Sequence, residues 1–292
     1  MQTFRPGEIV SGRYRISRFL AAGGMGEIYV ARDLPREEWV ALKTATCISL
    51  DDVRVLERIA VEARLARRVV HRNVCRVFDV GVHQGKAGVR PTESVPFLAM
   101  ELLTGETLRR RIRREGRLPL VIVASILRPV LAGISAIHAA GIVHRDIKSE
   151  NILLVPQARG ERVVVTDFGL AATVDGRLGI GNDQPMFVGT PATMAPEQRT
   201  GAPANPAMDI YALGVLLCEL LTGVRPALAP RRAAEDAGED ANEDANEDAA
   251  VAMAETIAGR DVRRIIARCL SADPNQRFRD VSELEAALGW SR

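Results

Sequence analysis

Cysteine is scarce in this sequence, with four among 292 residues, and no two cysteines stand close enough to form a CxxC pair. This spacing argues against a structural zinc site or a disulfide framework and favours reduced core thiols at Cys47, Cys75, Cys218 and Cys269. No run approaches eighteen uncharged apolar residues, and the start of the chain lacks the apolar region of a signal peptide. We therefore expect no membrane span in this segment and a cytoplasmic location.

The sequence also lacks a strong excess of charge of either sign. The formal net charge is +2, from 39 Lys and Arg against 37 Asp and Glu, which gives no global drive toward nucleic acid or an anionic membrane. Arginines cluster at 54–68 and at 109–114, but no aromatic residues interleave with them as in a single-strand binding surface. Solvated basic faces are the simpler interpretation, so we expect no nucleic-acid partner.

The length allows one large domain or two packed lobes. Strand-like segments are predicted in the first part of the chain, with a helix at 51–69, and the strands are 14–20, 27–32, 39–44, 74–82 and 97–102. After Gly105 the pattern becomes mostly helical, with predicted helices at 108–115, 119–140, 208–221, 261–270 and 281–288. A strand-rich part therefore precedes a helix-rich part.

Residues 234–249 differ from their surroundings, because Glu-Asp recurs every four residues with Ala, Gly and Asn between. Like charges at that spacing oppose helix formation. A solvated, partly disordered loop is our preferred interpretation. An acidic docking surface for a basic partner is the alternative.

A glycine-rich turn lies between the first two long predicted strands, from Leu20 to Ile28. At Gly23, Gly24 and Gly26 the missing side chains let backbone N–H groups approach phosphate oxygens. Glycine-rich hairpins are often only turns, so this signal is weak by itself.

The strand that follows makes the signal specific. Strand alternation places Ala41 and Lys43 on the same side, so that a small residue can admit adenine while an ammonium group meets phosphates. A lysine between apolar neighbours in a central strand needs a carboxylate partner. Glu62 is the candidate for that partner, and Glu57 is the competing choice.

A later segment carries an acid, a lysine, an amide and a second acid in one order: Asp146, Lys148, Asn151 and Asp167. Asp146 can accept or orient the proton of an attacking hydroxyl, and Lys148 can neutralise charge on a transferring phosphoryl group. Asn151 and Asp167 can supply oxygen ligands to Mg²⁺, which keeps waters and shares the phosphates of the nucleotide. Together they predict phosphoryl transfer from ATP.

These motifs, together with His144 and the Ala195 to Glu197 segment, resemble the eukaryotic-like serine/threonine protein kinases of bacteria over nearly the whole chain. The resemblance implies an α+β, bilobal protein-kinase fold. In it, a small antiparallel sheet lobe with one main helix occupies residues 1–102, and a larger, mainly helical lobe occupies 103–292. It also implies ATP with Mg²⁺ or Mn²⁺ as cofactors, and Ser or Thr hydroxyl groups of proteins as acceptors.

The same resemblance assigns roles to individual residues. Met100 looks like the gatekeeper, and the backbone of Glu101 and Leu103 would meet adenine. Lys148 with Thr190 resembles the pattern for serine and threonine acceptors. The further nucleotide contacts that it implies are Leu20 at the glycine-rich turn, with Ile28, Ala41 and Leu153 around the ring.

Two structural roles also follow from the resemblance. Glu197 looks like the partner of Arg277 in a buried ion pair. Asp209 looks like the aspartate at a helix start that bonds the catalytic-loop backbone.

Some positions depart from the family pattern. Ala21 replaces the first glycine of the loop, and Ser149 stands where proline is common. Residues 170–188 contain a single hydroxyl residue, Thr173, so we do not expect loop phosphorylation, and Asp183 or another carboxylate would supply part of the charge that Arg145 awaits. An inactive or weakly active scaffold that binds nucleotide or a partner remains the alternative function.

Overall fold

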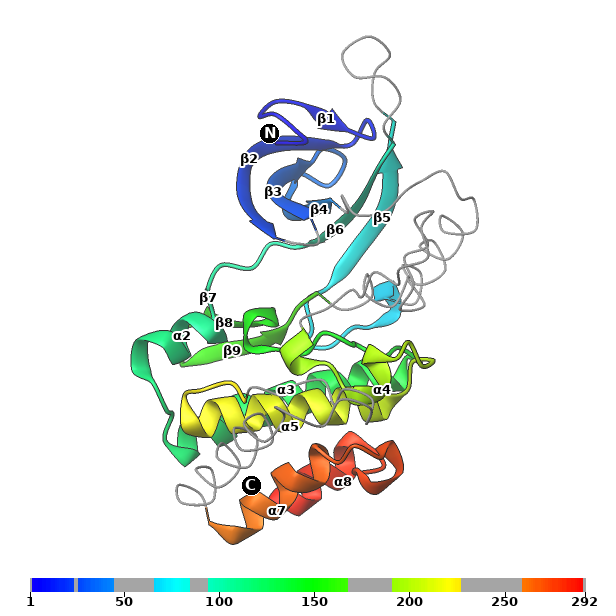
Figure 1. The fold of residues 1–292 in the computed structure, drawn as a ribbon. Helices are drawn as coiled ribbons and strands as arrows, with labels where there is room; N and C mark the ends of the chain where they lie inside the picture. The colour runs from blue at the N-terminus through cyan, green and yellow to red at the C-terminus, as the bar shows by residue number, and fades with distance from the viewer. Residues whose placement is uncertain are drawn as a thin grey trace, which may run out of the picture. The chain divides into compact units, whose positions relative to one another are not determined.

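The computed structural model describes residues 2–23, 26–44, 66–84, 94–167, 191–226 and 259–290. The chain forms two compact units, Met1–His71 with Cys75–Thr104, and Arg72–Val74 with Gly105–Arg292. Figure 1 shows strands in the first unit and mainly helices in the second. The boundary of the lobes that the sequence places between residues 102 and 103 stays a prediction.

The first unit is built on one antiparallel sheet with the strand order β1-β2-β3-β4-β6-β5. Aromatic and β-branched residues, which suit a half-buried pleated surface, are frequent in the long strands. The strands are β1 (Ile9–Val10), β2 (Tyr14–Gly23), β3 (Gly26–Asp33), β4 (Glu38–Thr44), β5 (Val77–His83) and β6 (Val95–Glu101).

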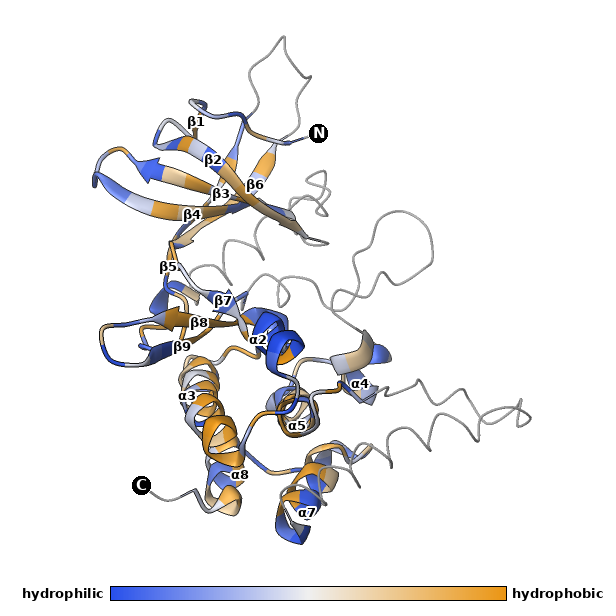
Figure 2. Ribbon diagram, turned by 90° about the vertical axis from the view of Figure 1, so that its left-hand side faces the viewer, coloured by the Kyte–Doolittle hydropathy of each residue, from blue (hydrophilic) through white to orange (hydrophobic). Residues whose placement is uncertain are grey.

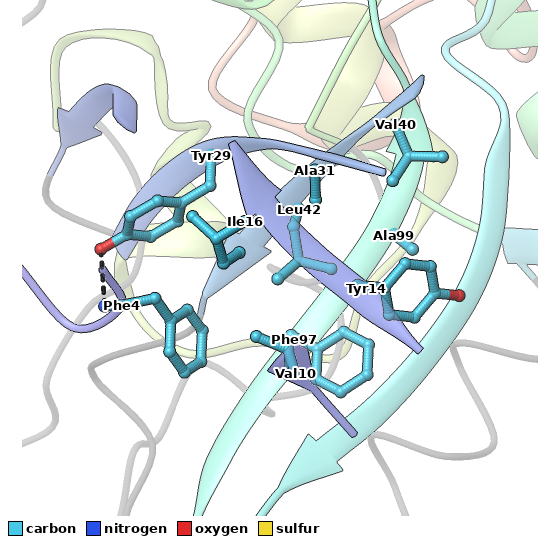
Figure 3. Packing of buried hydrophobic residues seen from close by; sticks show 10 residues of the cluster. All are labelled: Phe4, Val10, Tyr14, Ile16, Tyr29, Ala31, Val40, Leu42, Phe97 and Ala99. Atoms are coloured by element: carbon cyan, nitrogen blue, oxygen red, sulfur yellow. Dashed lines mark hydrogen bonds between the residues drawn. The ribbon is translucent and has the colours of Figure 1, made fainter. Parts of the chain in front are cut away.

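One face of this sheet carries the hydrophobic core of the unit. Directly paired residues point to the same face, so the pairs Tyr29–Leu42 and Leu42–Ala99 continue one apolar row across three strands. Phe4, from the segment before β1, packs on this cluster, and its backbone N–H donates to the Tyr29 hydroxyl (Figure 3). Because successive residues of a strand point to opposite faces, the residues directly before and after each member of this row lie on the opposite face of the sheet.

The second unit is mainly helical; α3 and α5 are the most hydrophobic of the helices in Figure 2, whereas α2 carries mostly hydrophilic residues. Asn205 caps α5, Pro206 occupies its first turn, and Gly223 ends it with a left-handed φ of 79°. The helices are α2 (Leu108–Glu115), α3 (Leu120–Ala139), α4 (Pro196–Arg199), α5 (Pro206–Thr222), α7 (Arg260–Cys269) and α8 (Val281–Leu288), with single 3₁₀ turns at Ser149–Asn151, Pro191–Thr193 and Pro274–Gln276.

Helix α3 is long and apolar enough to cross a membrane by length and composition alone. Its buried side chains face the core of the unit, where α3 contacts strand β9 (Glu161–Val165), α5 and α8. Gly133 allows α3 to approach β9 and the segment at Asn73, since a Cβ there would lie 2.8 Å from the Asn73 carbonyl oxygen and 3.3 Å from a Val165 side-chain carbon. Core packing therefore accounts for part of the hydrophobicity of α3, since 44% of its apolar window is buried.

A small antiparallel sheet in this unit was not predicted from the sequence. It pairs β7 (Glu106–Thr107), β8 (Ile152–Pro156) and β9 (Glu161–Val165) in that order. The apolar runs in β8 and β9 are short, and periodicity alone does not separate strand from helix in such runs, although Pro156 and Gly160 between them were a turn signal. These strands matter because β8 follows Asn151 directly and β9 ends just before Thr166 and Asp167.

The other predicted elements agree closely with the structure, and the helices at 108–115 and 281–288 match it to the residue. The strand predicted at 74–82 begins later, at Val77, because Val74 instead forms a bridge with Val165. Of the helix predicted at 51–69, the structure describes residues 66–69, of which 66–68 are helical. Most of that helix and the acidic segment 234–249 lie outside the described residues.

Candidate active site

The loop that carries Asp146 is hydrogen-bonded through its backbone to the buried carboxylate of Asp209. Asp209, in the first turn of α5, accepts hydrogen bonds from the backbone N–H groups of His144 and Arg145, both at 2.8 Å. The His138 ring nitrogen Nε2 lies 2.8 Å from the same carboxylate. The predicted role of Asp209 is confirmed.

This anchor stabilises an unusual backbone. Arg145 has a φ of 65°, in the left-handed region that a residue with a side chain rarely adopts, at a cost on the order of 1 kcal/mol or more. The two bonds to Asp209 and a bond from the Gln198 side chain to the Arg145 carbonyl offset that cost. The bend therefore persists, and it presents Asp146 next to Lys148 and Asn151.

His144 connects the two ends of the site. Its Nδ1 accepts from the Asp146 backbone N–H at 3.3 Å, so its Nε2 carries the proton and donates to the Thr166 carbonyl at 3.0 Å. The ring is fully buried. The His144 ring therefore links the loop at Asp146 to Thr166, the residue just before Asp167, through one hydrogen bond on each side.

Asp146, Lys148 and Asn151 form one hydrogen-bonded cluster. The Lys148 ammonium lies 2.9 Å and 2.8 Å from the two carboxylate oxygens of Asp146. The Asn151 side-chain N–H₂ group donates to the Asp146 carboxylate and to its backbone carbonyl, both at 2.8 Å. Because the nitrogen end of the amide is used in this way, the oxygen end is the atom that remains for a metal ion.

Asp167, the second predicted metal ligand, directly follows Thr166, which is hydrogen-bonded to Asn151, the first predicted ligand. Thr166 donates its backbone N–H and its hydroxyl to the Asn151 carbonyl, at 2.8 Å and 3.1 Å. Asp167 follows at once with a φ of 63°, which is again left-handed. Two oxygen ligands suit Mg²⁺, and among the described residues no group of three or more His, Cys, Asp or Glu side chains could hold a metal.

In the first unit, Lys43 is 4% exposed and lies on the sheet face opposite the aromatic core. On that face it pairs with Ile28 on β3 and Leu98 on β6, and two residues back Ala41 pairs with Met100. The predicted phosphate-binding lysine therefore shares one surface with predicted adenine contacts. This is the arrangement that the strand alternation implied.

Gly23 and Gly26 pair across the β2–β3 hairpin. Gly26 has a φ of 138°, and a Cβ there would lie 1.9 Å from the Thr44 carbonyl oxygen. Only glycine allows β3 to begin this close to the end of β4, one residue after Lys43. Gly23 has open space around its Cα instead.

Most of the remaining residues that were predicted to contact the nucleotide lie in the described part of the chain. The Glu101 backbone N–H donates to the Arg76 carbonyl at 2.8 Å and the Glu101 carbonyl accepts from the Cys75 thiol at 3.8 Å, so the predicted adenine contact of Glu101 stays a prediction. Leu153 lies on β8 and Leu20 on β2, where a β-bulge interrupts the pairing near Leu20, while Leu103 is half-buried. Gly24, Glu62, Thr190 and the competing Glu57 lie outside the described residues, so their roles stay predictions.

The predicted ion pair between Glu197 and Arg277 is confirmed. The guanidinium group of Arg277 donates to both Glu197 oxygens, at 2.7 Å and 2.8 Å, and to the carbonyls of Ala207 and Ser271. Its carbon Cζ lies 4.9 Å from the centre of the Tyr211 ring. The pair ties α4 to α5 and to the segment between α7 and α8.

A group of charged side chains that contacts the loop at Ser149 and Glu150 was not predicted from the sequence. Arg109 and Arg225 contact the buried carboxylate of Glu219, and Arg225 also reaches Ser149 and Glu150. The signal was present, because Glu219 interrupts an otherwise apolar stretch of α5, and a buried carboxylate needs a cation.

Comparison with known proteins agrees with this geometry. The protein kinase domain family matches residues 14–286. The serine/threonine-protein kinase PknA of Mycobacterium tuberculosis is 38% identical over 222 residues, which cover 76% of this chain and 49% of that protein. PknL of Mycobacterium bovis is 38% identical over 218 residues, 75% of this chain and 51% of that protein, so the chain spans about half the length of these relatives.

Solved structures confirm the fold class. The kinase domain of Mycobacterium tuberculosis PknI has a TM-score of 0.71 and 22% identity, covering 98% of this chain and 99% of that chain. The predicted protein-kinase fold and the resemblance to bacterial serine/threonine kinases are both confirmed. This chain belongs to the protein kinase domain family.

Proposed function

We propose that this chain transfers the γ-phosphate of ATP to Ser or Thr hydroxyl groups of proteins. The observation that carries the proposal is the cluster in which Asp146 binds both the Lys148 ammonium and the Asn151 amide. A buried aspartate with these partners is held in one orientation, and positioning supplies most of the catalysis in phosphoryl transfer.

Each residue has a role that follows from its chemistry. Asp146 orients the acceptor hydroxyl and accepts its proton, while Lys148 stabilises negative charge on the transferred group. Lys43 neutralises phosphate charge. The Asn151 oxygen and the Asp167 carboxylate would hold Mg²⁺, which neutralises the phosphates when bound.

The alternative of an inactive scaffold gains no support. The acid, the lysine and the amide of the predicted set are all present, and they are hydrogen-bonded to one another. A cytoplasmic location remains part of the proposal, supported by the buried free thiols of Cys75, Cys218 and Cys269 in the described part of the chain. A basic partner for residues 234–249 also remains a proposal.

The test is Asp146→Asn, with transfer from Mg-ATP to a basic protein substrate measured beside ATP binding by calorimetry. We expect transfer to fall by about 10²-fold to 10⁴-fold while ATP affinity changes little, because the side chain keeps its shape and loses its capacity as a base. Asp261→Asn, at an exposed position on α7, is the matched control. Equal transfer by wild type and Asp146→Asn would refute catalysis by this site.

A further inference from the structure

Arg225 makes an unusual number of contacts with the back of the catalytic loop. Its nitrogen Nη2 lies 3.0 Å from the Ser149 hydroxyl and 2.6 Å from a Glu150 carboxylate oxygen. The same nitrogen lies 3.3 Å and 3.4 Å from the two oxygens of Glu219 on α5. One guanidinium group therefore joins the segment between Lys148 and Asn151 to a core helix.

The carboxylate on α5 that Arg225 contacts is buried and has a second arginine partner. Glu219 is 1% exposed and also receives Arg109 from α2 at 2.5 Å. The backbone that presents Arg225 is held as well, because the Thr222 hydroxyl bonds the carbonyls of Cys218 and Val224 at the end of α5. The contacts of the Arg225 side chain converge on Nη2, so a single nitrogen links Ser149 and Glu150 to Glu219.

Ser149 supplies the contact on the side of the loop. Its hydroxyl is an acceptor for Arg225 and is fully buried, and a residue without a hydroxyl or other acceptor in its side chain could not make this contact. Ser149 begins the 3₁₀ turn that ends at Asn151, and within it the Asn151 backbone N–H donates to the Lys148 carbonyl at 2.9 Å. The contact acts directly on the turn that places both catalytic side chains.

The charges in this group stabilise one another. The Arg225 guanidinium lies between the carboxylates of Glu150 and Glu219, at 2.6 Å and 3.3 Å, so one cation serves two acidic side chains. Burial disfavours the charged form of Arg225, yet its bond to Glu150 and the charge of Glu219 raise its pKa. Arg225 therefore remains charged.

We propose that Arg225 is a positioning residue, which holds Ser149 and Glu150 against α5 and so fixes the placement of Lys148 and Asn151. This inference rests on the proposed kinase activity and deepens it. Arg225 touches neither Lys148 nor Asn151 in its hydrogen bonds, so its effect passes through the turn. Loss of Arg225 should therefore lower turnover more than it lowers binding.

The experiment compares Arg225→Ala with Arg111→Ala. Arg111 is a fair control because it has similar exposure, 17% against 14%, and also binds two glutamates in the same unit, Glu115 and Glu161. We expect Arg225→Ala to lower kcat about 10-fold to 100-fold with KM for ATP within about twofold, since small misplacement of reacting groups is costly. Arg111→Ala should keep the kcat of the wild type.

Two further kcat measurements distinguish a positioning role of Arg225 from general destabilisation of the protein. Arg225→Lys keeps the charge, and we expect it to restore part of the lost kcat. In a double-mutant cycle, Ser149→Ala should cost little once Arg225 is already alanine, because the two changes remove one shared contact. Additive effects on kcat would contradict the proposed link.

Hydrogen exchange of the intact chain gives a reading that does not need activity. Amide exchange in the segment 144–151 should be faster in Arg225→Ala than in Arg111→Ala. Equal kcat and equal exchange in the two variants would overturn the inference while leaving the kinase assignment intact. If the wild type transfers no more phosphate than Asp146→Asn, the proposed function fails, and faster exchange would then support a structural clamp only.

Discussion

Gly26 gives the sharpest test of how the glycine-rich turn and Lys43 depend on each other. A Cβ at this position would lie 1.9 Å from the Thr44 carbonyl oxygen and 2.8 Å from the carbonyl carbon, and the backbone φ is 138°. Both atoms belong to the main chain, so no side chain can move away to make room. Gly26→Ala must therefore separate the start of β3 from the end of β4 or change its own backbone.

The cost can be worked out from these two terms. An alanine in a sparsely populated backbone region costs about 1–3 kcal/mol, and the clash adds strain of similar size, so we expect a loss of about 2–6 kcal/mol in the free energy of unfolding. For a chain above 150 residues, this corresponds to a fall in Tm of roughly 4–24 °C. Since Thr44 follows Lys43 directly, ATP affinity and kcat/KM should fall as well.

Gly23→Ala is the matched control, since it changes the same hairpin where nothing lies within 4 Å of the new Cβ. We expect its Tm to stay within about 2 °C of the wild type, because alanine fits this backbone and restricts the unfolded chain. Thermal unfolding followed by circular dichroism compares the two variants. Equal Tm values for Gly26→Ala and Gly23→Ala would refute the reasoning.

Three further predictions concern anchors in the two units. Arg277→Ala should destabilise the protein by about 3–5 kcal/mol, because Glu197 is left without its cation, and the double variant Arg277→Met with Glu197→Gln should lose less; equal losses in chemical denaturation would contradict this. Asp209→Asn should lower kcat about tenfold, since one amide oxygen cannot accept from His144, Arg145 and His138 together, and an unchanged kcat in steady-state assays would count against the anchor. The hydrogen bond from Arg13 lowers the pKa of the Asp33 carboxyl. The contribution of this carboxylate to stability is therefore present above about pH 4 and is lost as the pH falls through the lowered pKa. Asp33→Asn should flatten the dependence of Tm on pH in that acid range, and a slope equal to that of the wild type would contradict the prediction.

Much of the catalytic machinery could be predicted because its residues are close together in the chain. Asp146, Lys148 and Asn151 lie within one loop, and the chemistry of an acid, an amine and an amide in that order points to one reaction. Strand alternation likewise predicted that Ala41 and Lys43 share a face, and the register of β3, β4 and β6 agrees. Short-range patterns carry this information because neighbours in a strand or loop have few ways to be arranged.

The contacts that hold the machinery in place needed the tertiary structure. The sequence could mark Glu219 as a charge in an apolar stretch, but it could not say which arginines would reach it, since Arg109, Arg225 and Ser149 come from separate segments. Strands β8 and β9 were missed for a related reason, as short apolar runs take their conformation from the partners they pair with. The amino-acid order thus determined which groups do the chemistry. Packing between distant segments decided how rigidly they are held, because such contacts depend on chain geometry that no local pattern encodes.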